Sequence, residues 1–376
     1  MKRLPVVAIT CYPSQGGSGV VASELGLNLA RRGYEVHFVT SDLPLRLRRY
    51  DRNIVFHRVE AVSYPVFQHT PYTLALATKM AEVVERHGVD VLHVHYAIPH
   101  TASAFLAQQM VGPERVKVVT TLHGTDITLV GQEPGYFAMT RFLIDRSDAV
   151  TTVSTFLKEE TRRVFGTARP IDVIPNFVDP RRFRPRPDLD RGCLAPAGEK
   201  IVLHASNFRP VKNTDAVIRA FARVAAAVPS RLILVGEGPD LGAAEALARE
   251  LGVADRVRAL GQSENLEDLL AMADLTLLPS RHESFGLVAL ESMACGTPVI
   301  VTGNGGAGEF VEHGINSYLC DPDDLESIAA PAVRLLTDER HYRSVAEDGL
   351  RAAVARFGTT CVIKRYVELY DRLLEA

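Results

Sequence analysis

The chain has 376 residues, of which 47% are hydrophobic and 23% are charged, and its formal net charge is −3 at pH 7. This length and composition predict a globular protein of about two domains, each large enough to bury a core. The small negative charge argues against a protein that coats nucleic acid or associates stably with an anionic membrane.

The five cysteines are scattered along the chain, and none of them forms a Cys-x-x-Cys pair. That pattern is typical of reduced thiols in a cytoplasmic protein and argues against a disulfide framework or a zinc knuckle. The amino-terminal apolar run, PVVAIT, is too short for a signal peptide or a membrane span. We therefore expect a cytoplasmic protein, and the sequence is compatible with a homo-oligomer.

Strand and helix patterns alternate along the first part of the chain. Apolar runs such as PVVAIT, EVHFVT and DVLHVH predict strands, and VVASELGLNLARRG between the first two predicts a helix. This alternation predicts an α/β domain with a parallel sheet over residues 1–175. Because such sheets bind ligands beyond the carboxyl ends of their strands, functional residues are expected in the loops that follow the apolar runs.

A change of composition separates this region from a second, similar one. Residues 176–200 are rich in proline and arginine, which predicts a linker between domains. The runs IVLHAS, RLILVG, RVRALG, DLTLLPS and PVIVT then predict the strands of a second α/β domain over residues 201–357. Helical patterns continue from there to the end of the chain.

Three loops of the first domain hold candidate ligand-binding residues. In CYPSQGGSG, Gly16 and Gly17 would let the backbone approach a ligand, and Ser18 is a candidate helix cap. Tyr96 in HYAIPH and His123 in LHGTDIT each follow an apolar run directly. Each loop taken alone also has an ordinary structural explanation, as a turn before a helix or as a buried histidine.

The segment HESFGLVALESMACGTPV places Glu283 and Glu291 eight positions apart around a turn that enters a short helix. We expect Glu283 in the loop and Glu291 about two turns inside the helix. The amides of Phe285, Gly286 and Leu287 would then lie at the helix N-terminus, where an anion is favoured. Carboxylates beside anion-binding amides suit a sugar nucleotide, which carries hydroxyl groups on either side of a diphosphate.

Two cations accompany this segment. Arg209 and Lys212 follow the predicted strand IVLHA, and cations three residues apart are suited to neutralise a diphosphate. A solvated basic turn is the alternative explanation.

The sequence ESFGLVALESMACGTPVI closely resembles the donor-site signature of the retaining glycosyltransferases of family 4. The resemblance covers essentially the whole chain and implies the GT-B fold, in which two Rossmann-like domains with parallel sheets face a cleft. It also implies that a last helix, at about residues 358–376, returns to the first domain. The loop GGAGEF matches the family through Gly305, Gly306 and Glu309, whereas Ala307 and Gly308 depart from the usual residues and leave its shape open.

The loops GGSG, HYAIPH and LHGTDIT are similar to those of the family 4 enzymes that begin bacillithiol synthesis. This similarity implies transfer of N-acetylglucosamine from UDP-GlcNAc to the hydroxyl of L-malate, giving the α-linked product and UDP. Both partners expected for the chain are therefore small molecules.

The resemblance also implies roles for individual residues. The residues expected at the reaction centre and at the diphosphate are His123, Glu283, Arg209 and Lys212. Glu291 is expected to bind the ribose. The other expected donor-binding residues are Gly16, Gly17, Asn207, Glu237, Gly261, Ser284, Phe285, Gly286 and Leu287. The expected acceptor-binding residues, which would offer donors to a dianion, are Ser18, Tyr96, Thr121 and Arg141, with Arg146 as the second choice of arginine.

Three other motifs suggest a dinucleotide site or a metal site, but the sequence argues against each. GNGGAG at 303–308 fits the dinucleotide pattern G-x-G-x-x-G, but it lies late in the chain and Glu309 would meet the pyrophosphate with the wrong charge. His93 and His95, with His100 or His123, are zinc-ligand types, yet strand histidines are more often hydrogen-bonded. The Asp-x-Asp triplets at 188–190 and 321–323 lie away from predicted strand ends. We therefore expect no metal and no cofactor.

Other functions are compatible with the same motifs. A family 4 enzyme with the same donor chemistry could use an inositol phosphate or a polysaccharide as acceptor. A UDP-GlcNAc 2-epimerase shares the two-domain architecture, and a non-enzymatic sensor would bind the sugar nucleotide and release it unchanged. An epimerase needs no acceptor, which separates it from a transferase.

Overall fold

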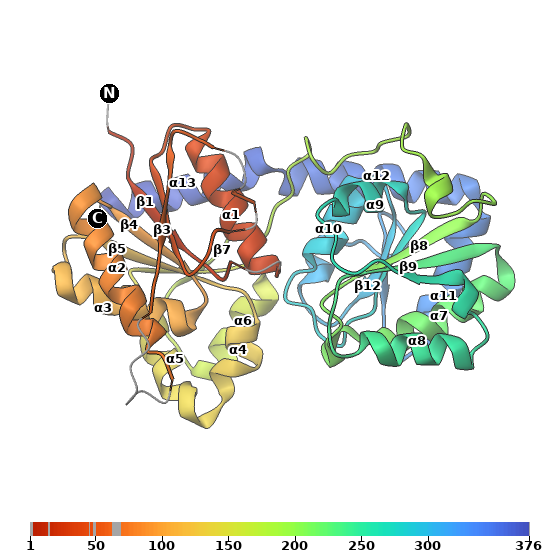
Figure 1. Ribbon diagram of the computed structural model, residues 1–376, viewed down its shortest axis with the longest axis horizontal. Coiled ribbons are helices and arrows are strands. Elements are labelled where there is room, and N and C mark those ends of the chain that lie inside the picture. The colour runs from red at the N-terminus through yellow and green to blue at the C-terminus, as the bar shows by residue number, and fades with distance from the viewer. Residues whose placement is uncertain (1–2, 14–15, 45, 48–49, 62–68, 376) are drawn as a thin grey trace. The chain divides into compact units, whose positions relative to one another are not determined.

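A computed structural model describes residues 3–13, 16–44, 46–47, 50–61 and 69–375 (Figure 1). The chain divides into two compact units, Met1–Asn176 with Val362–Ala376, and Phe177–Cys361. Each unit has a parallel sheet with alternating strands and helices, so the predicted α/β class with two Rossmann-like domains is confirmed.

Seven parallel strands form the sheet of the first unit within the described residues, in the order β3-β2-β1-β4-β5-β6-β7. These strands are β1 Val7–Thr10, β2 Val36–Thr40, β3 Ile54–Arg58, β4 Val91–His95, β5 Lys117–Leu122, β6 Ala149–Thr152 and β7 Ile171–Val173. The helices are α1 Gly17–Ala30, α2 Tyr72–His87, α3 Ala102–Val111, α4 Thr125–Thr128, α5 Pro134–Arg146, α6 Thr155–Phe165 and α13 Thr359–Glu375. A π-helical turn, η1, covers Ala97–Thr101, and a 3-10 turn, η2, covers Val130–Gln132.

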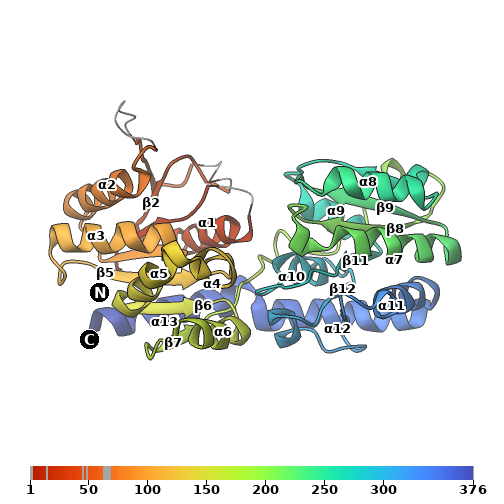
Figure 2. The same ribbon diagram turned by 90° about the horizontal axis from the view of Figure 1, so that it is seen from below.

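Alternate side chains of β4 pack against different helices. Leu92 and Val94 belong to an apolar cluster with residues of α2 and α3. His93 points to the other side, where its Nδ1 lies 2.6 Å from the hydroxyl of Tyr370 on α13. Figure 2 shows α2 and α3 on one side of this sheet and α13 on the other. The last helix therefore belongs to the core of the first unit, as the family resemblance implied.

The second unit repeats this plan with six parallel strands within the described residues, in the order β10-β9-β8-β11-β12-β13. They are β8 Lys200–Ala205, β9 Ser230–Val235, β10 Val257–Ala259, β11 Leu275–Leu278, β12 Val299–Thr302 and β13 Tyr318–Cys320. The helices are α7 Thr214–Ala227, α8 Leu241–Glu250, α9 Leu266–Met272, α10 Leu287–Ala294, α11 Leu325–Thr337 and α12 Glu339–Phe357. Figure 1 shows α7, α8 and α11 on one side of the sheet and α9, α10 and α12 on the other.

Short 3-10 turns complete the second unit. They are η3 Arg191–Cys193, η4 Pro210–Lys212, η5 Ala254–Arg256 and η6 Gly306–Glu309.

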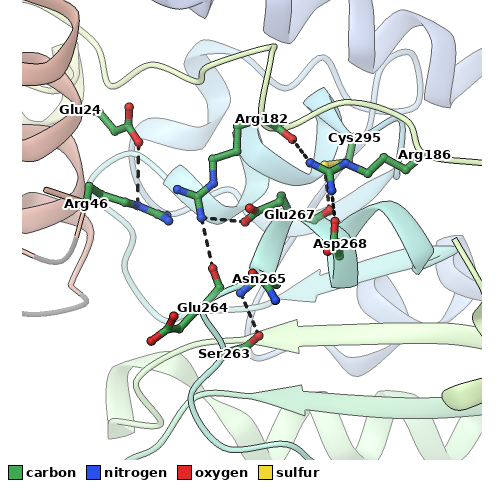
Figure 3. Close-up of polar contacts among 10 residues, drawn as sticks. All are labelled: Glu24, Arg46, Arg182, Arg186, Ser263, Glu264, Asn265, Glu267, Asp268 and Cys295. Carbon is green, nitrogen blue, oxygen red and sulfur yellow. Dashed lines mark hydrogen bonds and ion pairs between the residues drawn. The ribbon is translucent and has the colours of Figure 1, made fainter. Parts of the chain in front are cut away.

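The composition predicted a linker over residues 176–200, but all of these residues except Asn176 belong to the second unit. Arg182 donates to Glu267 at 2.8 Å and to the carbonyl oxygen of Glu264 at 3.2 Å, and Arg186 pairs with Asp268 (Figure 3). The side chains of Phe177, Phe183 and Leu194 are buried. The arginines therefore serve as internal partners of α9, a role that their frequency in the sequence does not reveal.

Candidate functional site

The loops that follow β8 and β9 approach each other through two glycines. Gly236 has a φ of 116°, and a Cβ at this position would lie 1.9 Å from the carbonyl oxygen of Ser206. A Cβ at Gly238 would lie equally close, at 1.9 Å, to the carbonyl oxygen of Asn207. Only glycine permits this approach, which brings Asn207 close to the loop that holds Glu237.

The loop after β10 joins the same group. The amide of Gly236 donates to the carbonyl oxygen of Gly261 at 2.7 Å, and Gln262 donates to Glu237 at 3.1 Å. Asn207 and Glu237 are exposed. Three residues expected to bind the donor, one on each loop, therefore lie at the carboxyl ends of three adjacent strands.

Lys212 and Glu283, two of the expected reaction-centre residues, form an ion pair. Their Nζ and Oε2 atoms lie 2.8 Å apart, and the side chains are 24% and 22% exposed. Lys212 ends the turn η4, and the next residue, Asn213, anchors that turn by donating to the carbonyl oxygens of Pro279 and Pro322 at 3.2 and 2.9 Å. Arg209 precedes the turn and is exposed, so the two predicted cations differ in their surroundings.

The loop with two glycines holds the backbone of Glu283. Glu283 donates its amide to the carbonyl oxygen of Asn304 at 3.1 Å and accepts from the amide of Gly306 at 2.9 Å. Gly305 has a φ of 143°, and a Cβ there would lie 1.8 Å from the carbonyl oxygen of Glu283. Despite the unusual Ala307 and Gly308, the loop is therefore closely fitted to the predicted donor-site glutamate.

Helix α10 lies in the segment for which the sequence predicts a short helix. Gly286 occupies its N-cap with a φ of 93°, and no side chain caps it, so the first amides are available to an anion. Phe285 is 1% exposed and packs against Phe310 and Phe357 at ring-centre distances of 5.1 and 5.9 Å. This packing fixes the turn that presents the amides of Gly286 and Leu287.

Glu291 is the fifth residue of α10, so it lies about one turn inside the helix, whereas two turns were expected. The helix begins later than predicted because the turn with positive φ at Gly286 precedes it. The side chain of Glu291 is largely buried, with 4% of its surface exposed. Ser284, the remaining expected donor-binding residue of this segment, is partly buried in the same turn.

In the first unit, His123 follows β5 and keeps part of its surface exposed. Its Nε2 lies 2.8 Å from Nδ1 of His95, and its ring packs 5.5 Å from the ring of Tyr96. Removal from water lowers the pKa of His123 to about 3. The imidazole is therefore neutral near pH 7 and can exchange hydrogen bonds with a ligand without carrying a charge.

Asp126 holds the loop of His123 in place, and the sequence reasoning missed it. Its carboxylate is buried and accepts the amides of Ala97, His123 and Gly124 at 3.1, 3.2 and 2.9 Å. Burial raises its pKa to about 6, although the three hydrogen bonds oppose that shift. Asp126 therefore ties the loop after β4 to the loop after β5. An aspartate just after the His-Gly turn was the available signal, because such side chains often bond nearby amides.

The expected acceptor-binding residues have different environments. Tyr96 has a φ of 83°, and its amide donates to the carbonyl oxygen of Thr121 at 2.9 Å. The Thr121 side chain is fully buried, and its hydroxyl lies 2.7 Å from both His93 and Thr151. Thr121 therefore holds the Tyr96 loop through its backbone carbonyl oxygen, and its hydroxyl is buried. Arg141 is exposed on α5.

The glycine loop before α1 differs from the prediction in one respect. Ser18 was expected to cap the helix, but α1 begins at Gly17 with Gly16 at the N-cap, so Ser18 is already its second residue. The earlier start arises because glycine also occupies an N-cap. Residues 14 and 15 of this loop lie outside the described part of the chain.

The rejected motifs have local structural roles. His93 contacts Tyr370 and Thr121, and His100 donates to the carbonyl oxygen of His95 at 2.6 Å, as expected for hydrogen-bonded strand histidines. The stretch GNGGAG leads into the four-residue turn η6, which is too short for a dinucleotide-binding helix. Asp323 pairs with Arg281 at 2.6 Å, and Asp190 caps the turn η3.

Comparison with known proteins identifies the family. The model described as Glycosyltransferase Family 4 matches residues 15–182, and the model described as Glycosyl transferases group 1 matches residues 186–351. The N-acetyl-alpha-D-glucosaminyl L-malate synthase of Bacillus anthracis is 47% identical over 98% of this chain and 97% of its own length. The chain belongs to glycosyltransferase family 4. This family 4 member is therefore an enzyme that transfers a sugar.

Two further proteins are similar to this glycosyltransferase. The D-inositol 3-phosphate glycosyltransferase of Thermobispora bispora is 30% identical, over 96% of this chain and 90% of its own length. The crystal structure of Anabaena HepE in complex with UDP-glucose superposes with a TM-score of 0.82 at 22% identity, covering 97% of this chain and 99% of HepE. At that identity the superposition supports the GT-B fold alone. Among the described residues, no helix has the length and apolar character needed to cross a membrane.

Proposed function

We propose that this family 4 glycosyltransferase moves N-acetylglucosamine from UDP-GlcNAc to the hydroxyl of L-malate, with retention of the α configuration. The similarity to the Bacillus anthracis synthase, 47% over nearly the whole chain, is the observation that carries the choice of substrates. The ion pair of Lys212 and Glu283 beside the start of α10 supports the donor half of the proposal, because it combines a cation with a hydroxyl acceptor.

In the proposed reaction the bond between C1 of the sugar and the diphosphate oxygen breaks while the malate oxygen bonds to C1. Negative charge then develops on the leaving diphosphate, and preorganised positive groups lower the barrier most effectively there. Arg209, Lys212 and the first amides of α10 are the groups that we assign to this charge. Because they are already cationic or polar, no divalent metal is required.

Glu283 has a second role in this proposal. Its carboxylate pairs with Lys212 at 2.8 Å. A bound donor would offer a diphosphate to Lys212 and a sugar hydroxyl to Glu283, so both charges keep a partner when the substrate replaces their mutual contact. Glu291, one turn into α10, is assigned to the ribose hydroxyls.

The acceptor half rests on residues of the first unit. Malate is a dianion near neutral pH, so its carboxylates require donors, for which Arg141, Tyr96 and the amides at the start of α1 are the candidates. His123 is neutral and is assigned to positioning the sugar and the acceptor. No protein nucleophile is assigned: the malate hydroxyl attacks from the side of the leaving group, and its proton passes to a phosphate oxygen of UDP.

A second candidate acceptor, an inositol phosphate, is supported by the relative from Thermobispora bispora that is 30% identical. An acceptor screen tests both. Purified enzyme is incubated with UDP-GlcNAc and either L-malate, D-malate, inositol 3-phosphate or no acceptor, with UDP release and product mass as readouts. L-Malate should give a glycoside whose anomeric proton coupling shows the α configuration. Turnover with the inositol phosphate alone would replace malate, and a new sugar nucleotide without acceptor would indicate an epimerase.

A further inference from the structure

Three histidines that are distant in the sequence meet at the β3 edge of the first unit. His37 lies on β2, His57 on β3 and His87 at the end of α2, and one ligand atom from each lies within 4.8 Å of the others. The ring centres of His37 and His57 are 5.1 Å apart, and those of His37 and His87 are 4.5 Å apart. Within the described residues, this is the one group of three or more histidine, cysteine or acidic side chains with spacing that suits a metal ion.

The fold explains why these side chains converge. In the parallel register His37 pairs with Val55 and His57 pairs with Val39, so both histidines project from the same face of the sheet. That face is covered by α2, whose last residue is His87. Gly88 then reverses the chain with a φ of 64°, which leaves His87 at the exposed rim of the group.

A carboxylate orients the most buried of the three rings. Glu35 accepts a hydrogen bond from Nε2 of His37 at 3.0 Å. The other nitrogen of His37, Nδ1, therefore carries the lone pair, and it lies 2.8 Å from Nε2 of His57. A carboxylate that holds the distal N–H of a metal-binding histidine is the usual arrangement behind such ligands.

Two charged side chains beside His57 offset one another. Lys79 and Glu82 on α2 pair at 2.7 Å, so together they add no net charge next to the three rings.

We propose that Nδ1 of His37, Nε2 of His57 and a ring nitrogen of His87 bind one divalent transition metal ion, with Zn²⁺ as the ion of first choice. Three histidines with an open position for water form a known zinc coordination. Tetrahedral Zn²⁺ with bonds of about 2.0–2.1 Å needs ligand nitrogens about 3.3 Å apart. The rings of His37 and His57 must therefore separate slightly, and the proton on Nε2 of His57 must move to its Nδ1.

This site includes none of the residues assigned to the sugar donor or the acceptor. Its ligands come from the edge strand β3, its neighbour β2 and the helix that covers both. A metal ion there would fasten the edge strand to α2 and would stabilise the first unit, whereas sugar transfer remains the task of other residues.

Zinc titration of the untagged full chain, freed of metal by chelation and dialysis, tests the proposal. Calorimetry with Zn²⁺ alone should show saturable binding of one ion per chain. Co²⁺ should give the visible absorption that is typical of tetrahedral coordination. His57→Ala and His87→Ala should each abolish saturable binding. Glu35→Gln should weaken it by roughly 10- to 100-fold. His69→Ala, which removes an exposed histidine outside the group, is the matched control and should bind like the wild type.

Two results would overturn the proposal. One is the absence of saturable Zn²⁺ binding by the wild type, and the other is binding by His57→Ala and His87→Ala as tight as that of the wild type. Circular dichroism of each variant establishes that it is folded. Because the His87 side chain is exposed, its replacement is the variant least expected to disturb folding.

Discussion

The two units of this glycosyltransferase share one strand order but place different polar chemistry on it. The sheets follow the equivalent orders β3-β2-β1-β4-β5-β6 and β10-β9-β8-β11-β12-β13. In the first unit, β4 and β5 lead to neutral imidazoles such as His95 and His123, which hydrogen-bond to each other. In the second unit, the loops after β8 and β11 carry the ion pair of Lys212 and Glu283.

This difference shows which property the scaffold determines and which it leaves to the side chains. A parallel sheet determines where the loops lie, whereas the residues just beyond the strands decide whether the site is neutral or charged. A neutral network suits the orientation of hydroxyl groups, and a charged one suits a leaving diphosphate. The following experiments test that division.

The largest expected effect is a difference in acid stability between the units. Burial keeps the pKa of His93 and His123 at about 3 and of His100 at about 4, and lowers that of His95 well below its usual value. Below about pH 6.5 the unfolded chain binds protons that the folded chain does not, so stability falls as the pH falls. Between pH 7 and pH 5, each of His93, His100 and His123 costs about 2 kcal/mol of stability.

One group in the same unit opposes this trend. The pKa of Asp126 is raised to about 6, so the folded state binds this proton at a higher pH than the unfolded state does. As the pH falls from 7 to 5, this group therefore adds about 1 kcal/mol of stability. The second unit has one comparable buried histidine, His204, with a pKa of about 4. Hydrogen exchange at both pH values, corrected for intrinsic rates, should show β4 and β5 losing more protection than β8 and β9. Equal losses would contradict the comparison.

The next largest effect concerns the charged site. Arg209→Ala/Lys212→Ala should lower kcat by about 100-fold or more, near 2.7 kcal/mol, because the leaving diphosphate loses its cations. The matched control is Arg281→Ala, since Arg281 pairs with Asp323 on the surface with both side chains more than half exposed. Such a pair contributes little, so this control should retain turnover. Near-normal turnover of the double variant would remove these cations from the leaving-group role.

A smaller effect is expected for the ribose contact. Glu291→Gln keeps the shape of a buried side chain but removes its charge, which should weaken UDP binding by roughly 1.5–3 kcal/mol. Calorimetry with UDP measures this directly, and a thermal melt checks that the variant is folded. An affinity within a factor of about two of the wild type would count against the ribose role.

The acceptor arginine should have a still smaller effect. Arg141→Ala should raise the KM for malate about tenfold, equivalent to 1.4 kcal/mol, and should leave UDP affinity unchanged. Arg146→Ala on the same helix is the comparison, because Arg146 lies over the ring of Phe142 at 5.4 Å. If only the Arg146 variant changes the KM, the malate carboxylate binds there.

The sequence predicted the longer strands and the donor loops because each has a local pattern. It missed β7 and β13, which have three residues each and lie at sheet edges. The equally short edge strand β10 was predicted only because it lies within the longer run RVRALG. It also took 176–200 for a linker, because proline and arginine content does not reveal that Arg182 and Arg186 have acidic partners on α9.

Contacts between side chains of distant segments were harder to predict from the sequence. The segment with Glu283 and the loop with Arg209 and Lys212 each suggested a ligand site. Lys212 and Glu283 are 71 residues apart in the sequence, however, so only the fold reveals that they pair. His37, His57 and His87 show no motif at all, and only the parallel register and the end of α2 bring them together. The histidines that did attract a zinc interpretation, His93 and His95, occupy hydrogen-bonded positions instead.

The smallest expected effect is that of metal removal on catalysis. In the proposed reaction Arg209, Lys212 and the amides at α10 supply the positive potential for the diphosphate, so exhaustive treatment with a chelator should change turnover by less than about twofold. The same treatment should empty the histidine site at the β3 edge, and added Zn²⁺ should raise the thermal stability of the wild type but not of His87→Ala. Turnover and melting temperature measured on the same chelated sample separate the two effects. Loss of turnover that Mg²⁺ or Mn²⁺ restores would contradict metal-free transfer. If the turnover of His87→Ala were also lost on chelation and restored by these ions, the required ion would bind outside the histidine site.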